Sequence, residues 1–212
     1  MHLFDELPRA HYGAILADPP WRFATWNKAE AVPKCRRIGS PGYGNISSAY
    51  HYTTMTNAEI CALPVGELAA EDCVLFLWTS WPQLEDALKV ITAWGFKFKT
   101  AGFVWAKAHA GQLELFEQAI PDQIGMGYWT RANTEACLLA TRGKPKRLDA
   151  GVRQAIIEPR REHSRKPDCV HGRIERLVAG PYLELFARAR RPGWDAWGNE
   201  LDKFQTVQEA AE

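Results

Sequence analysis

The feature that most constrains this chain is a short apolar run that ends at once in an acid, two prolines and a tryptophan. Residues 14–17 (Ala-Ile-Leu-Ala) have the length and composition of a buried strand. Pro19 and Pro20 lack an amide hydrogen and cannot extend a sheet ladder, so we expect the strand to end at Asp18. The sequence therefore predicts a carboxylate, several carbonyls and the indole of Trp21 at the carboxyl end of one strand, where open α/β sheets bind ligands.

These groups suit the activation of a weak nitrogen nucleophile. The exocyclic amino group of a nucleobase has its lone pair delocalised into the ring, and two hydrogen-bond acceptors localise it. Asp18 and the carbonyl of Pro19 are candidates for these acceptors, and Trp21 is a candidate to stack on the base. The structural alternative is a strand followed by a proline-rich turn, with Asp18 bonded to its own backbone and Trp21 in the core. From these residues alone both interpretations stay open.

Strand and helix signals alternate through the rest of the chain. Apolar runs predict further strands at residues 73–79, 101–107, 135–141 and 181–188, with a short edge strand at 155–157. Helices are predicted from a capping box at 56–59 to about residue 63, over 81–94, and from 166–168 onward. The pattern predicts an α/β fold of three layers with a mostly parallel sheet.

Composition narrows the functional classes. The formal net charge of 212 residues is +1, so a nucleic-acid-binding surface must be local. Residues 142–166 offer one, since they carry nine Lys or Arg against three acids. The five cysteines form no Cys-x-x-Cys pair, which favours reduced thiols over a disulfide framework or a zinc site, and we expect no metal. With no secretory signal and no apolar run of membrane length, we expect a cytoplasmic protein.

Four further blocks accompany Asp18-Pro19-Pro20-Trp21. They are GYWTRANTE at 127–135, HSRKPD at 163–168, ELFAR at 184–188 and GWDAWGN at 193–199. In this order the blocks resemble the MT-A70 family of S-adenosylmethionine-dependent adenine-N(6) methyltransferases, in its bacterial or phage DNA type. The resemblance covers nearly the whole chain. It implies the methyltransferase (Rossmann-like) form of the α/β fold in circularly permuted order, with the catalytic strand first and the cofactor strand near the end.

The resemblance also implies residue roles. The catalytic residues are Asp18, Pro19, Pro20 and Trp21. The residues implied for S-adenosylmethionine are Asp18, Lys166, Glu184, Phe186, Arg188, Asn199 and Glu200. The residues implied for the substrate are Trp21, Tyr52, Trp129, Arg131, Asn133 and Glu135. Each role has a structural alternative: Glu184 is a candidate for a salt bridge to Arg188 or a nearby lysine, and Asn199 for a helix cap. The last strand also lacks the Gly-x-Gly loop of dinucleotide oxidoreductases.

Domain organisation is predicted to be simple. Residues 1–212 are expected to form a single methyltransferase domain, with a polar tail at 203–212 that frays. Two polar stretches, 22–51 and 109–131, are predicted to be mobile loops at the active site and substrate. The alternative for both is a solvated loop without a function.

Three functions stay open. The first is methylation of adenine in DNA, and the second is the same chemistry on adenosine in RNA, which no residue separates from the first. The third is a non-catalytic nucleic-acid-binding partner, against which the intact Asp18-Pro19-Pro20-Trp21 argues. We therefore expect nucleic acid as a partner, with DNA ahead of RNA and no membrane. A homodimer or a second subunit is left open.

Overall fold

The computed structural model describes residues 4–22, 54–108, 129–130, 132–162 and 165–201. These residues form one seven-stranded sheet with the order β5-β3-β4-β2-β1-β6-β7. The strands are β1 (Tyr12–Ala17), β2 (Ala69–Thr79), β3 (Lys97–Ala108), β4 (Thr134–Arg142), β5 (Ala155–Pro159), β6 (Tyr182–Leu185) and β7 (Trp194–Trp197). Strand β4 is antiparallel to both neighbours, while all other pairs are parallel. The predicted mostly parallel sheet is therefore confirmed.

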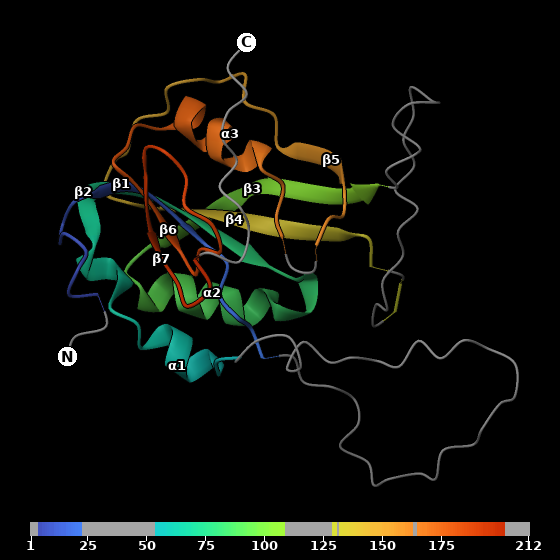
Figure 1. Cartoon of the computed structure of the whole chain (residues 1–212), viewed down its shortest axis with the longest axis horizontal. Helices are drawn as coiled ribbons and strands as arrows, with labels where there is room; N and C mark the ends of the chain where they lie inside the picture. The colour runs from blue at the N-terminus through green and yellow to red at the C-terminus, as the bar shows by residue number, and fades with distance from the viewer. Residues whose placement is uncertain (1–3, 23–53, 109–128, 131, 163–164, 202–212) are drawn as a thin grey trace, which may run out of the picture.

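Helices cover both faces of this sheet. Helices α1 (Asn57–Cys61) and α2 (Leu84–Ala93) lie on one side, and α3 (Cys169–Leu177) lies on the other (Figure 1). Along β1 the side chains alternate between the two faces, as period-2 geometry requires. A hydrophobic core cluster fills each face of the sheet. Ile15 belongs to the cluster beneath α1 and α2, whereas Leu16 belongs to the cluster beneath α3. The three layers predicted from the sequence are present.

Local sequence explains where the helices begin and end. At α1 both halves of a capping box form: the Glu59 amide donates to Thr56 Oγ1 at 3.2 Å, and the Thr56 amide donates to Glu59 Oε2 at 2.7 Å. Short 3₁₀ turns precede β2 (Val65–Glu67) and α2 (Trp81–Gln83). Gly95, just after α2, has a φ of 82°, a left-handed value that glycine adopts without strain.

The middle of the sheet contains a topological switch point. The connection from β1 to β2 runs through α1, on the face of the sheet that α1 and α2 cover. The connection that leads into β6 runs through α3 on the opposite face, and β7 then adds to the sheet beyond β6. Strands β1 and β6 are adjacent and parallel, with Ala17 opposite Leu185. Ligands of open α/β sheets bind outside the carboxyl ends of strands at such a point. Asp18 follows β1 there, and Phe186 follows β6.

Two sequence expectations about the end of the chain differ from the structure. The last predicted strand, 181–188, ends at Leu185, because Phe186 turns the chain with a φ of 61°. Strand β7 was not predicted, since four residues that include the exposed Asp195 lack a continuous apolar run. The predicted edge strand at 155–157 is confirmed as β5.

None of the described helices has both the length and the apolar character needed to span a bilayer.

Candidate active site

Asp18 belongs to a chain of four charged side chains at the carboxyl end of β1. Lys166, three residues before α3, donates from Nζ to Asp18 Oδ2 at 2.8 Å and lies 3.3 Å from Glu135 Oε2. Lys107 on β3 approaches the other oxygen of Glu135 at 2.5 Å. Two ammonium groups therefore alternate with two carboxylates across four elements. The Lys166 ammonium also lies 5.6 Å from the ring centroid of Trp78, within cation–π distance.

The two carboxyls differ in their electrostatic surroundings. Burial raises the pKa of Asp18, and the charges of Lys166 and Arg188 offset only part of this rise. Burial acts in the same direction on Glu135, but Lys166 and Lys107 together hold its pKa at about 2. Burial disfavours the charge on Lys166, yet Asp18 and Glu135 raise its pKa above the ordinary value. Asp18 is therefore the carboxyl that more readily accepts a proton.

The two prolines and Trp21 form a tight turn after Asp18. The Trp21 amide donates to the Pro19 carbonyl at 2.8 Å, and the Met55 amide donates to the Pro20 carbonyl at 2.9 Å. Trp21 is 4% exposed, and its indole N–H donates to the Trp78 carbonyl at 3.0 Å. A carbonyl oxygen has two lone pairs, so Pro19 retains one acceptor position. Trp21 is therefore a core residue, as expected if it packs in the interior and does not stack on a base.

A pocket opens beside Asp18 between β1, β6 and the start of α3. Of the seven residues predicted for the cofactor, five line it, namely Asp18, Lys166, Glu184, Phe186 and Arg188. Glu200 is not on its wall but lies 3.5 Å from Arg188, between its Oε2 and the arginine Nε. Asn199 is exposed in a turn away from this lining, and no helix begins there among the described residues. The structure thus gathers most of the predicted cofactor residues at the switch point.

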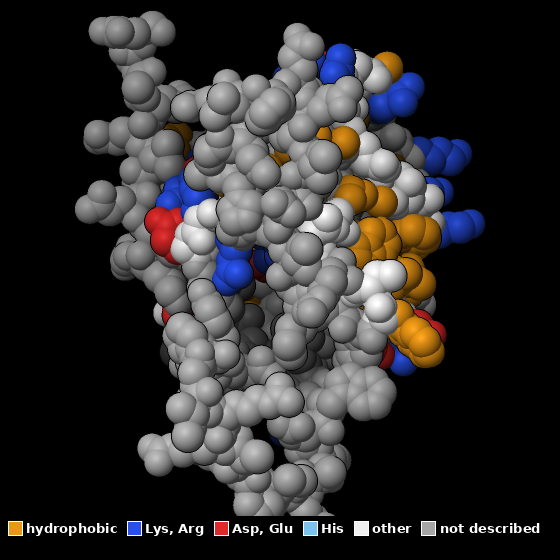
Figure 2. Space-filling model, turned by 90° about the vertical axis from the view of Figure 1, so that its right-hand side faces the viewer, with side chains coloured by type: hydrophobic (Ala, Val, Ile, Leu, Met, Phe, Trp, Pro, Cys, Tyr) orange, Lys and Arg blue, Asp and Glu red, His pale blue; other side chains and the backbone are white. Residues whose placement is uncertain are grey.

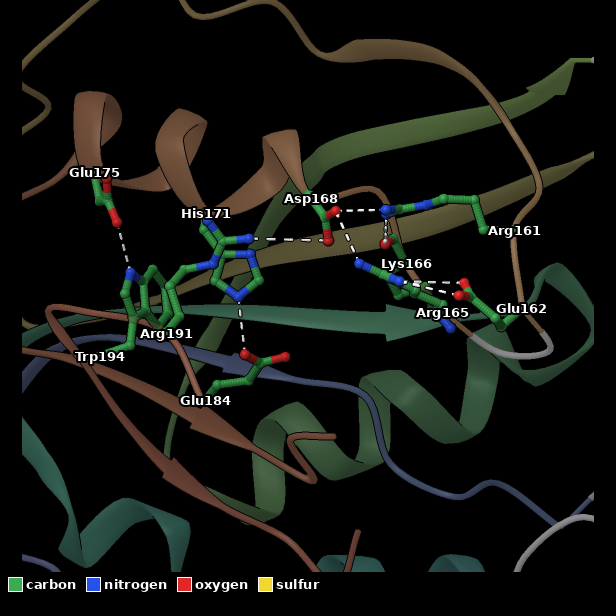
Figure 3. A network of polar contacts seen from close by, with 10 residues as sticks. All are labelled: Arg161, Glu162, Arg165, Lys166, Asp168, His171, Glu175, Glu184, Arg191 and Trp194. Carbon is green, nitrogen blue, oxygen red and sulfur yellow. Dashed lines mark hydrogen bonds and ion pairs between the residues drawn. The ribbon is translucent and has the colours of Figure 1, made fainter. Parts of the chain in front are cut away.

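Glu184 has a partner that the sequence did not suggest. The expected alternatives were Arg188 or a lysine, but His171 Nε2 lies 2.8 Å from Glu184 Oε2 (Figure 3). Glu184 pairs with Leu16 in the β1–β6 register, and Leu16 belongs to the cluster on the α3 face. This placement brings Glu184 under α3, where His171 is the third residue of the helix.

An arginine cluster lies beside the same pocket, whose wall includes Arg165, Asp168 and Arg191. Arg161, Arg165 and Arg191 approach the carboxylate of Asp168 at 2.5, 3.2 and 3.9 Å (Figure 3). Arg165 also contacts Glu162 at 3.2 Å. Three guanidinium groups share the carboxylates of Asp168 and Glu162, and the charge of Glu158 also acts on Arg161. Arg161 and Arg165 come from the basic stretch at 142–166, and Arg191 joins them from the segment between β6 and β7.

The residues predicted for the substrate are less closely gathered. Glu135 contacts Lys166, as described above. The Asn133 carbonyl accepts from the Lys107 amide at 3.0 Å, just before β4. Trp129 is fully exposed. Tyr52 and Arg131 lie outside the described residues, as do the loops predicted at 22–51 and 109–131, apart from Arg22 and residues 129–130.

Sequence reasoning missed two residues of this site, His171 and Trp78, which line the pocket. It named Lys107 as a candidate for phosphate or cofactor, with a solvated lysine as the alternative, but the structure pairs Lys107 with a carboxylate. Its partner Glu135 sits on the neighbouring strand, paired with Trp105, so the contact is a diagonal cross-strand pair that only the β3–β4 register reveals. His171 follows the Lys166-Pro167-Asp168 block within one helical turn, and this spacing was a usable signal.

Comparison with known proteins matches most of the chain to one family. The family model of MT-A70 matches residues 12–200. The chain is 34% identical to the type II methyltransferase M.MunI of Mycoplasma sp over 94% of this chain and 82% of that protein. It is 30% identical to the N(6)-adenosine-methyltransferase MT-A70-like protein of Drosophila melanogaster, over 98% of this chain but 30% of that protein. Against the human N(6)-adenosine-methyltransferase catalytic subunit METTL3, identity is 29% over 90% of this chain and 28% of that protein.

Proposed function

The chain belongs to the MT-A70 family of adenine-N(6) methyltransferases, and from this premise we propose that it methylates the exocyclic amino group of adenine in DNA, with S-adenosylmethionine as the methyl donor. The observation that carries the proposal is the contact of Lys166 with Asp18. It joins the predicted catalytic turn to a pocket lined by predicted cofactor residues. The DNA substrate is favoured because the type II methyltransferase M.MunI matches across most of its own length.

The pocket has suitable groups for such a cofactor. Glu184 offers a carboxylate to the ribose hydroxyls, and Arg188 and Lys166 offer cations to a carboxylate. The indole nitrogen of Trp78, also on the pocket wall, is buried without a hydrogen-bond partner among the described residues, a state that a ligand acceptor would relieve. When bound, the cofactor supplies an electrophilic methyl group on a sulfonium.

The residues of the chain then prepare the nucleophile. Asp18 and the free lone pair of the Pro19 carbonyl accept the two N–H bonds of the adenine amino group, which localises the nitrogen lone pair toward the methyl group. S-adenosylmethionine held by Glu184, Arg188 and Lys166 would supply the methyl group, and its sulfur would keep the electron pair of the broken carbon–sulfur bond. The methylated nitrogen is cationic and acidic, and Asp18, with its raised pKa, accepts the proton. Lys166 holds the Asp18 carboxylate in place during both steps.

The arginine cluster supports a nucleic-acid substrate. Arg165 and Arg191 line the pocket, Arg161 meets them at Asp168, and guanidinium groups bind phosphates in a bidentate geometry. Figure 2 views the molecule from the side to which β3 points in Figure 1 and shows basic and acidic side chains exposed together there. In a duplex the adenine must leave the base stack to reach Asp18.

A second candidate is adenosine in RNA, favoured by the identity to the N(6)-adenosine-methyltransferases of Drosophila and human, of which the chain spans only about a third or less.

The test is transfer of labelled methyl from S-adenosylmethionine to single-stranded DNA, duplex DNA and RNA of matched sequence. Asp18→Ala is the control. Label in DNA that depends on Asp18 supports the proposal, whereas label mainly in RNA supports the second candidate. No label in any of them, with no cofactor binding, contradicts both.

A further inference from the structure

We propose that His171 is a positioning residue that holds Glu184 ready to accept hydrogen bonds from the hydroxyls of the cofactor ribose; this inference rests on the cofactor role proposed above. The two side chains face each other from α3 and β6 (Figure 3). His171 Nε2 lies 2.8 Å from Glu184 Oε2, and the side chains are 12% and 22% exposed. Both line the pocket that contains Asp18 and Lys166.

The geometry assigns the hydrogen of this contact to the histidine. A carboxylate only accepts hydrogen bonds, so His171 Nε2 must carry the hydrogen. The other ring nitrogen, Nδ1, is buried and has no hydrogen-bond partner among the described residues. Among the described residues, the hydrogen bond to Glu184 is therefore the one that this ring makes.

A second layer of contacts fixes the histidine ring itself. The ring of Trp194 on β7 lies edge-to-face against His171, with centroids 4.9 Å apart. Trp194 is held in turn, because its Nε1 donates to Glu175 Oε1 at 2.6 Å and its ring stacks on Tyr182 at 4.9 Å. Glu175 lies one turn after His171 on α3. These contacts leave His171 little freedom to turn away from Glu184.

Fixing Glu184 in advance has a direct consequence for binding. An isolated glutamate samples several rotamers, and binding a diol would require it to give up that freedom. The bond to Oε2 orders the side chain beforehand and leaves Oε1 as the acceptor for a hydroxyl. Pre-organisation of this kind raises affinity without adding a contact to the ligand. His171 thus acts on the cofactor through Glu184, without touching the reacting atoms.

The experiment measures binding of S-adenosylhomocysteine, and of its 2′,3′-dideoxy analogue, by calorimetry. His171→Phe keeps an aromatic ring against Trp194 but removes the donor, and we expect affinity for S-adenosylhomocysteine to fall roughly tenfold. His171→Gln, whose amide nitrogen reaches the same place, should restore affinity to within about twofold. The dideoxy analogue lacks the hydroxyls, so His171→Phe should change its affinity by less than about twofold. In Glu184→Gln, adding His171→Phe should cost little more.

Two further measurements separate positioning from general damage. Tyr182→Phe removes the hydrogen bond to the Val178 carbonyl at 2.9 Å from the same cluster, and it should leave the affinity within about twofold. In the ligand-free protein, nitrogen NMR of the imidazole should show hydrogen on Nε2. In turnover, His171→Phe should raise KM for S-adenosylmethionine while kcat at saturation changes little.

Each contrary result has a distinct meaning. Unchanged affinity in His171→Phe, with weakened binding in Glu184→Gln, would overturn the positioning role and leave the proposed function intact. Equal weakening for both ligands would show a structural effect and also overturn it. If the unmodified protein bound neither S-adenosylmethionine nor its product, the proposed function itself would fail, and this inference with it.

Discussion

Lys166 Nζ donates to Asp18 Oδ2 at 2.8 Å, which joins two residues that are 148 positions apart in the chain. The contact places the element before α3 against the turn after β1. A lysine between two partly buried carboxylates both orients them and compensates their charge.

Asp18 itself provides the first prediction. Asp18→Asn keeps the shape of the side chain but replaces a charged acceptor by a neutral amide, so we expect the rate of methyl transfer to fall at least about a hundredfold. The measurement is single-turnover transfer of labelled methyl to DNA. Retained binding of S-adenosylhomocysteine and a retained thermal transition are the controls for folding. A rate within about threefold of the unmodified protein would contradict the proposed role.

The pH dependence of activity is the second prediction. Asp18 must be ionised to take the proton of the methylated nitrogen, and its pKa is raised, so activity should rise with pH through a range above that of an ordinary aspartate. Lys166 lowers the pKa of Asp18, and Lys166→Met removes that influence. The acidic limb of the kcat/KM profile should therefore move to higher pH in Lys166→Met. A limb that stays in place or moves to lower pH would count against Asp18 as the titrating group.

Glu135 yields a prediction about stability. It contacts two lysines, so Glu135→Gln leaves two partly buried ammonium groups with less compensation and should lower the free energy of unfolding by about 3 kcal/mol at pH 7. The pKa of Glu135 is about 2 in the folded protein, below its ordinary value of 4.5. Its contribution is therefore complete above about pH 4.5 and is lost as the pH falls toward 2.

Urea titrations of Glu135→Gln and the unmodified protein at several pH values test this sign. The difference in unfolding free energy should be largest near neutral pH and should shrink below pH 4.5. Glu71→Gln, an exposed change on β2, is the matched control and should stay within about 0.5 kcal/mol. A difference that grows toward acid pH would contradict the assignment.

The arginine cluster predicts a salt-dependent effect on nucleic acid. Arg161→Gln and Arg191→Gln should each weaken binding of duplex DNA for all sequences alike, and each should reduce the slope of log affinity against log salt by about one. Arg176→Gln, at the other end of α3 and paired with Asp149, is the matched control and should bind as the unmodified protein does. Fluorescence anisotropy with a labelled duplex measures both quantities. Equal slopes in all four proteins would place the phosphate contacts elsewhere.

The fold was predictable from sequence because its signals are local. The Asp18-Pro19-Pro20-Trp21 turn, the capping box at Thr56 and the long apolar runs each specify an element without reference to the rest of the chain. The family followed from the blocks and is confirmed by the matching family model. Strands β1 and β6, which lead into two of these blocks, lie side by side in the sheet.

The site was less predictable because its contacts depend on register and crossover. The bond between Glu184 and His171 needs α3 to cross over β6, and the bond between Lys107 and Glu135 needs the β3–β4 pairing. Neither pair shows a spacing pattern in sequence. The short strand β7 was missed for a related reason, since its pairing with β6 rather than its own composition makes it a strand.

Trp21 provides the last prediction, because its two proposed uses make different demands. As a core residue, 4% exposed with its indole bonded to the Trp78 carbonyl, it should contribute to stability, and both Trp21→Phe and Trp21→Leu should lower the unfolding free energy by roughly 2–4 kcal/mol. As a stacking residue it needs an aromatic face, which Phe keeps and Leu lacks. Stacking contributes about 1–3 kcal/mol per base, so Trp21→Leu should lose at least about fivefold more kcat/KM for DNA than Trp21→Phe. Assays well below both unfolding temperatures separate the two effects. Equal kcat/KM in the two variants would show that Trp21 serves packing alone, and the adenine would then need another aromatic partner.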